Sequence, residues 1–180
     1  MKHQELIKAC RRNNLKAQMQ VYLLYKDMLY NVSLRILKNE QDAQDTVHDA
    51  FIKAFQNIPK VENELNLGAW LKRIVINCSL DFLRTKKKIG WLEDTITIQQ
   101  HEEGEETELF EDVSLTIEDV KKALINLKDK YRIIVVLYLL EDYTHKEIAA
   151  QLGLNESTVR NQYIRGKQLL KKQLQNKLVS

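Results

Sequence analysis

Residues that interrupt helices are scarce in this chain. The 180 residues include one proline, Pro59, and five glycines. Proline breaks a helix interior, glycine weakens it, and most windows of this sequence are rich in good helix formers. Apolar residues make up 44% of the chain, which is enough to form cores and excludes wholesale disorder. We therefore predict an all-α protein.

Long apolar runs are also missing. The longest, Ile133 to Leu140, is bracketed by Arg132 and Glu141 and is much too short to span a bilayer as a helix. The first residues, beginning Met1-Lys2-His3, do not have the pattern of a signal peptide. We expect a cytoplasmic protein that does not insert into membranes and is monomeric when free.

Cysteine and histidine are too few and too scattered to suggest a catalytic or metal centre. Cys10 and Cys78 form no CxxC pattern, and we predict two free thiols. No HExxH, GxSxG or phosphate-binding loop is present, so we predict no enzyme, no cofactor and no metal. One less favoured alternative is a metal held on a helix face by Asp45, His48 and Asp49.

Basic residues are absent from one stretch, residues 89–120. Eleven of the 25 acidic residues lie there, so the rest of the chain has 28 basic residues against 14 acidic ones. Two basic blocks indicate polyanionic partners, and the acidic stretch between them is too polar to form a core. We predict domains at residues 1–88 and 116–180, joined by an acidic linker at 89–115. This linker has weak periodicity, with a short amphipathic piece near Trp91 to Ile98 as an option.

The first block has the apolar spacing of three long helices around one core. Asn39 is placed to cap the second helix, Pro59 to end it, and Gly68-Ala69-Trp70 to open the third. The expected inward residues are Val21, Leu24, Met28, Val32 and Ile36 in the first helix, residues 43–58 at helical spacing in the second, and Trp70, Leu71, Ile74, Val75, Cys78 and Phe82 in the third. The third helix ends in a basic cluster, residues 84–88.

The last block starts at Thr116, which is spaced to form a capping box with Asp119. Val120, Ala123, Leu124 and Leu127 make the inner face of the helix that follows. The apolar run Ile133 to Leu137 fits either a buried strand or a buried helix. We prefer the helix, because a single strand would have no pairing partner.

Residues 144–170 carry the most informative motif. Thr144 and Glu147 form a second capping box, and Gly153 supplies the left-handed residue that ends a short helix. Asn155 can then start another helix. A short helix, a glycine turn and a second helix are typical of the helix-turn-helix. A plain helical hairpin with a solvated polar face is the alternative.

The second helix of this motif presents polar side chains where such helices meet base edges in the major groove. Arg160 can pair with guanine, and Asn161 or Gln162 can pair with adenine. Ser157 and Thr158 lie beside them. Arg165, Lys167, Lys171 and Lys172 follow and suit phosphate contacts.

The chain from about residue 17 to residue 172, the linker apart, resembles the extracytoplasmic-function group of sigma factors. Two motif sets carry the resemblance in the right order. Those similar to sigma region two are Leu34-Arg35-Ile36-Leu37, Asp42-Ala43-Gln44-Asp45, residues 50–55, and residues 70–74 followed by Asn77, Asp81 and Arg84. Those similar to region four are residues 123–127, Tyr131-Arg132, Glu147-Ile148-Ala149 and Ser157-Thr158-Val159-Arg160.

This resemblance implies a sigma factor that binds core RNA polymerase and promoter DNA. Region two would bind the polymerase clamp helices through Asp45, Asp49 and residues 51–55, including Phe51 and Phe55. It would capture the unpaired non-template strand of the minus-ten element through residues 60–68 and the third helix, with Lys72, Arg73, Asn77 and Arg84 as contacts. Region four would read the minus-thirty-five duplex and dock on the polymerase flap.

The resemblance also implies an anti-sigma partner, although no residue identifies it. It places the linker near the active-site cleft and RNA exit path, with a merely solvated linker as the alternative. Outside the sigma class, the alternative is a helix-turn-helix regulator that binds duplex DNA without polymerase.

Overall fold

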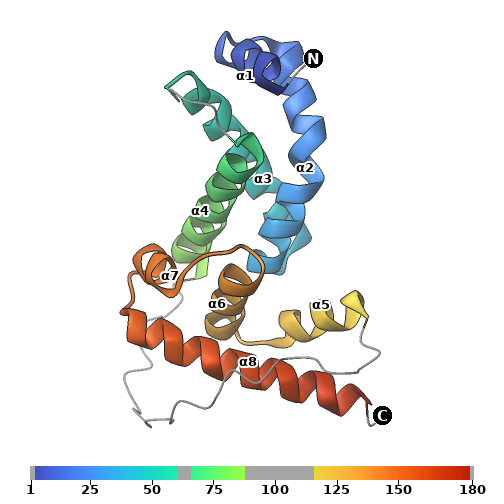
Figure 1. The fold of residues 1–180 in the computed structure, drawn as a ribbon. Coiled ribbons are helices and arrows are strands. Elements are labelled where there is room, and N and C mark those ends of the chain that lie inside the picture. Colours follow the sequence, from blue (N-terminus) through green and yellow to red (C-terminus); the bar gives the residue numbers. More distant parts are fainter. Residues whose placement is uncertain (1–2, 61–65, 88–115, 179–180) are drawn as a thin grey trace. The chain divides into compact units, whose positions relative to one another are not determined.

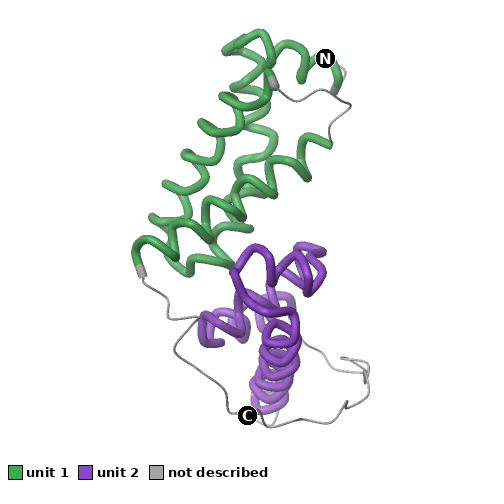
Figure 2. The backbone as a smooth tube through the Cα atoms, turned by 90° about the vertical axis from the view of Figure 1, so that its left-hand side faces the viewer, with its two compact units in different colours: residues 1–88 green, residues 89–180 purple. Residues whose placement is uncertain are grey.

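The computed structural model describes residues 3–60, 66–87 and 116–178, and the chain divides into two compact units, residues 1–88 and 89–180 (Figure 2). All regular secondary structure in these described ranges is helical, which confirms the all-α prediction. The linker predicted at residues 89–115 lies outside the described residues.

The described part of the first unit contains four α-helices and one short 3₁₀ helix (Figure 1). They are α1 (His3–Arg11), α2 (Leu15–Leu37), α3 (Glu40–Asn57), η1 (Ile58–Lys60) and α4 (Leu67–Lys87). The long helices α2, α3 and α4 pack on one another in all three pairs, and α1 packs on α2 and η1. The three-helix expectation was therefore one helix short, because α1 is a separate amphipathic helix that buries Leu6, Ile7 and Cys10.

Local chemistry sets the ends of these helices. The Asn14 side chain accepts a hydrogen bond from the Ala17 backbone N–H, and Asn39 accepts one from Asp42 in the same way. Such bonds satisfy donors that the first turn of a helix leaves unpaired. The helix α3 ends just before Pro59, as predicted.

The centre of the three-helix bundle contains one buried polar connection. The Ser79 hydroxyl lies 2.8 Å from the Val75 carbonyl oxygen and 3.0 Å from the Ser33 hydroxyl. Ser79 donates its single proton to the carbonyl, so Ser33 must donate to Ser79. The hydrogen bonds therefore run in one direction, from α2 to α4 and into the α4 backbone.

Two faces of the bundle differ from the sequence expectation. Leu24 and Met28 of α2 are exposed, and the buried face of this helix instead uses Leu29, Ser33 and Leu37. In α4, Trp70, Ile74 and Phe82 are only half-buried, whereas the core takes Leu67, Leu71, Val75, Ile76, Cys78, Leu80 and Leu83. The spacing of apolar residues allowed either side of each helix to be buried. The positions of the neighbouring helices determine which side is buried in the structure.

The second unit contains α5 (Ile117–Asn126), α6 (Asp129–Leu139), α7 (His145–Leu152) and α8 (Glu156–Leu178) (Figure 1). The helix α8 packs against the other three. Both predicted capping boxes are present, Thr116 with Asp119 and Thr144 with Glu147. The apolar run 133–137 is helical and fully buried in α6, which confirms the choice of helix over strand.

A partly buried ion pair lies at the junction between α5 and α6. The Arg132 side chain is fully buried, and its Nη1 lies 2.5 Å from Asp129 Oδ1. The same nitrogen lies 3.5 Å from the carbonyl oxygen of Leu127, the residue that ends α5. Burial lowers the pKa of Arg132, and the carboxylate of Asp129 opposes this shift. The guanidinium therefore holds the end of one helix against the start of the next.

Candidate nucleic-acid interface

The helices α7 and α8 form the predicted helix-turn-helix. Gly153 ends α7 in the left-handed conformation, with φ of 67°, and the Leu154 N–H bonds to the Ala149 carbonyl. A positive φ favours glycine because it has no Cβ. The backbone of Val159 then bonds to the Asn155 carbonyl at the start of α8. The two helices pack on each other with Ile148, Ala149 and Val159 buried.

The first turns of α8 divide into an outward and an inward side. Glu156, Ser157, Arg160 and Asn161 are exposed, whereas Thr158 is half-buried. Gln162 is also half-buried, and its Oε1 is enclosed by protein. Of the two amides proposed for adenine, only Asn161 is therefore presented outward.

The basic residues further along α8 also differ in exposure. Lys171 and Lys172 are exposed, and Arg165 and Lys167 are half-buried. Long basic side chains can lie along the protein with their stems covered and their charged ends in solvent. All four remain suited to contacts with phosphates, which need charge more than a fixed geometry.

Three aromatic rings connect α6, α7 and α8 beside the outward side of α8. The rings of Tyr138 and His145 stack at 4.3 Å between centroids, and Tyr163 lies 4.5 Å from Tyr138 and 5.2 Å from His145. Burial lowers the pKa of His145, and the positive charge of Arg160 lowers it further. Sequence analysis missed this cluster, because its members are far apart in the chain.

The strand-contacting residues predicted on α4 do not all share one face. Arg73, Asn77 and Arg84 are exposed, and their spacings of four and seven residues place them on one side of the helix. Lys72 is half-buried and lies off this side. Residues 61–65, part of the loop predicted to capture a single strand, lie outside the described residues.

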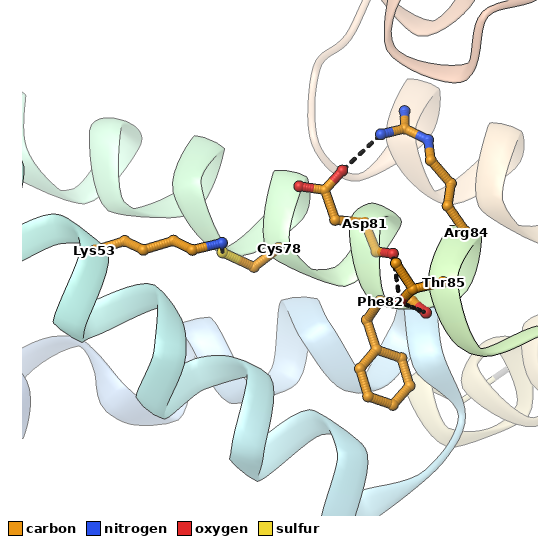
Figure 3. A network of polar contacts seen from close by, with 6 residues as sticks. All are labelled: Lys53, Cys78, Asp81, Phe82, Arg84 and Thr85. Carbon is orange, nitrogen blue, oxygen red and sulfur yellow. Dashed lines mark hydrogen bonds and ion pairs between the residues drawn. The ribbon is translucent and has the colours of Figure 1, made fainter.

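Polar contacts at the end of α4 involve two of its basic side chains, Arg84 and Lys86. Figure 3 shows the contact of Arg84 with Asp81. Arg84 Nη1 lies 2.6 Å from Asp81 Oδ1. Lys86 Nζ lies 4.6 Å from the centroid of the Phe82 ring and 3.4 Å from Asp42 Oδ1 of α3. These charges belong to an exposed surface rather than to the core.

The helix α3 presents a separate mixed surface. Asp45, His48, Asp49 and Ile52 are exposed, whereas Phe51 is buried and Phe55 is half-buried. The ring centroids of Phe51 and Tyr22 lie 4.9 Å apart. The Tyr22 hydroxyl lies 3.2 Å from His48 Nε2. The structure thus places Phe51 in the core beneath this surface.

Two further features bear on catalysis and metal binding. Lys53 Nζ lies 3.6 Å from the Cys78 sulfur (Figure 3), and burial raises the pKa of this thiol more than Lys53 lowers it. A protonated, buried thiol is unreactive.

Among the described residues no group of three histidine, cysteine or acidic side chains could hold a metal ion, so the alternative metal site at Asp45, His48 and Asp49 is not supported. No helix in the described part of the chain is long and apolar enough to cross a membrane.

The described residues form two small helical units, and one of them contains a helix-turn-helix with exposed polar side chains at the start of α8. Two family models match: Sigma-70 region 2 over residues 21–89, and Sigma-70, region 4 over residues 117–170. The chain belongs to the extracytoplasmic-function group of the sigma-70 family, whose members are RNA polymerase sigma factors.

Curated relatives are similar over most of their length. The chain is 31% identical to the RNA polymerase sigma factor SigV of Bacillus subtilis (strain 168), over 83% of this chain and 86% of that protein. It is 28% identical to the ECF RNA polymerase sigma factor SigW of the same organism, over 94% of this chain and 95% of that protein. Both relatives are RNA polymerase sigma factors.

Two solved structures share the fold. One is the sigma factor RpoE in complex with the anti-sigma factor NepR from Bartonella quintana, with a TM-score of 0.56 and 24% identity over 87% of this chain and 96% of that chain. The other is CnrH in complex with the cytosolic domain of CnrY, with a TM-score of 0.54 and 22% identity over 95% of this chain and 96% of that chain.

Proposed function

We propose that this sigma factor directs core RNA polymerase to promoters by contacting two DNA elements with its two units. The second unit reads the minus-thirty-five duplex, and the first captures the unpaired non-template strand of the minus-ten element. The observation that carries this proposal is the outward side of α8, where Ser157, Arg160 and Asn161 are exposed at the start of a helix-turn-helix reading helix. Such a helix places its first turns against base edges.

In the first unit we assign strand capture to the exposed side of α4. Arg73, Asn77 and Arg84 lie there together, with Lys72 beside them. Single strands bind to basic grooves that provide stacking or base pockets. Residues 60–68 complete this proposed site, and most of them lie outside the described residues. Melting is then stabilised by binding unpaired bases, without a catalytic residue.

We assign polymerase binding to the exposed surface of α3. Asp45 and Asp49 provide charge, Ile52 provides apolar area, and Phe51 and Phe55 support the helix from below. The clamp helices of the largest polymerase subunit are the proposed partner of this surface, and the flap is the proposed partner of the second unit.

We further propose an anti-sigma protein as a regulatory partner, because both solved neighbours are complexes, and one of these complexes contains an anti-sigma factor.

The first experiment measures co-elution of the full chain with sigma-free core RNA polymerase, with and without excess housekeeping sigma factor. Stoichiometric binding that the competitor displaces is the expected result. A well-folded chain that does not bind core polymerase, yet protects promoter duplex alone, would instead identify a polymerase-independent regulator.

A second experiment separates base reading from phosphate binding in the reconstituted holoenzyme. Arg160→Ala should weaken recognition at one upstream base pair by about 1–3 kcal/mol. Lys171→Ala should weaken binding to all sequences equally and reduce its dependence on salt concentration. Equal losses on every sequence for both variants would contradict the assignment of Arg160 to a base.

A further inference from the structure

The side chain assigned to base reading is not isolated on the surface of α8. Arg160 Nη2 lies 3.3 Å from Glu156 Oε1, one turn earlier on the same helix. Both side chains are well exposed, at 60% and 48% of their maximum. The pair therefore lies on the outward side that carries Ser157 and Asn161.

Stability of the fold does not explain this pair. Exposed ion pairs on a helix contribute only a few tenths of a kcal/mol, because solvent screens them and both side chains lose freedom. Glutamate in a first turn also interacts favourably with the helix dipole, but that effect does not require a bond to Arg160. The contact fixes the position of the guanidinium group. The two charges also act on His145 in opposite directions, since Arg160 lowers its pKa and Glu156 raises it.

The direction of the contact matters for DNA reading. Glu156 precedes Arg160, so it holds the guanidinium towards the N-terminal end of α8, which is the end that enters the major groove in helix-turn-helix proteins. A guanidinium has five N–H donors in a planar fork, and one bond to Glu156 leaves others for guanine O6 and N7. A negative carboxylate beside it also disfavours contacts to phosphates.

We propose that Glu156 is a positioning residue for Arg160, which holds the guanidinium in the orientation that binds guanine and thereby determines specificity at that base pair. This inference rests on the proposed reading of upstream duplex by α8. Without Glu156, Arg160 would still be charged and exposed. It would distribute its contacts between the base and nearby phosphates, so affinity would persist while discrimination fell.

The same unit contains a matched control. On α5, Lys121 Nζ lies 3.9 Å from Glu118 Oε2, and these side chains are 56% and 63% exposed. Glu118→Gln and Glu156→Gln both remove one negative charge from a first helical turn and one exposed intrahelical ion pair. A difference between these variants therefore reflects the place of Glu156 on α8, and the base pair at which it appears separates positioning of Arg160 from direct base reading by Glu156.

The test is selection of promoter DNA from a pool randomised in the upstream element, using core polymerase reconstituted with the full-length chain or its variants. Arg160→Ala identifies the base pair that Arg160 reads. Glu156→Gln is expected to lower the preference for the selected base at that same base pair about threefold, which is less than the roughly fivefold or greater loss for a whole base contact. Glu118→Gln should leave all preferences unchanged, and Glu156→Gln added to Arg160→Ala should change nothing further at that base pair.

Other outcomes overturn the inference. Loss of preference at a different base pair would make Glu156 a direct base reader, and unchanged preferences would leave it a helix-end residue only. If wild-type holoenzyme selects no upstream sequence, or Arg160→Ala changes no preference, the proposed function of α8 fails as well. Helical content and co-elution with core polymerase, measured for each variant, separate these results from misfolding.

Discussion

Gly166 of α8 lies so close to Val135 of α6 that a Cβ added at Gly166 would stand 2.7 Å from Val135 Cγ2. The same added atom would lie 3.2 Å from Tyr131 Cβ. Glycine inside a helix costs about 1 kcal/mol relative to alanine. The close approach of α6 and α8 therefore explains why residue 166 is a glycine.

Gly166→Ala should destabilise the second unit by about 1–3 kcal/mol, although alanine is the better helix former, because the added methyl group overpacks the crossing. Thermal unfolding followed by circular dichroism measures the change. Val135→Ala removes the opposing methyl groups, so the double variant should lose less stability than the two single variants added together. Strict additivity would show that the two residues do not oppose each other.

Asp129→Asn should destabilise the second unit by about 1–3 kcal/mol, because it removes the charge of a carboxylate that lies 2.5 Å from the buried guanidinium of Arg132. Glu118→Gln breaks an exposed ion pair in the same unit and should cost less than about 1 kcal/mol. Urea unfolding of the full chain measures both variants. Equal, small effects would mean that the Arg132–Asp129 pair contributes no more to stability than a surface pair.

Lowering the pH should destabilise the second unit through His145. Its pKa lies below the ordinary value of 6.5 in the folded chain, so the unfolded chain binds more protons. The free energy of unfolding should therefore fall as the pH drops below about 6.5, and this loss should level off below the folded pKa. Urea unfolding between pH 7.5 and pH 5 measures this slope.

Comparison of two histidine variants isolates this contribution. His145→Gln should flatten the pH dependence, even though it lowers stability at neutral pH by removing the ring stacked on Tyr138. His48→Gln, which changes an exposed histidine of the first unit, should leave the pH dependence of the second unit as it was. An unchanged slope in His145→Gln would assign the effect to other groups.

Ile52→Asp should weaken binding to core polymerase by about tenfold or more, because a charge would replace the apolar side chain at the centre of the proposed contact surface. Leu23→Asp provides the matched control on α2, since Leu23 and Ile52 are 58% and 56% exposed. The measurement is co-elution with core polymerase at several concentrations. Equal loss in both variants would indicate a general effect of added charge.

Features set by neighbours in the chain could be predicted from the sequence. The Thr116–Asp119 and Thr144–Glu147 boxes and the left-handed Gly153 each depend on a few consecutive residues, and all three are present. The helical state of residues 133–137 also follows, because all the surrounding elements are helices.

Features set by distant residues could not be predicted in the same way. Leu24 and Leu29 of α2 are equally apolar, and only the placement of the neighbouring helices buries Leu29 and exposes Leu24. At the candidate site, the exposed positions of Ser157, Arg160 and Asn161 match the sequence expectation. The aromatic cluster was missed because it is assembled from three separate helices.

The directed hydrogen bonds from Ser33 through Ser79 to the Val75 carbonyl have a consequence for how this family can diverge. If Ser33 changes to alanine, Ser79 keeps its acceptor and the core loses one hydrogen bond. If Ser79 changes first, the buried Ser33 proton loses its acceptor, which costs about 1–3 kcal/mol. Descendants of this sequence should therefore replace position 33 before position 79, so that lineages with alanine at 33 and serine at 79 outnumber those with the reverse pair.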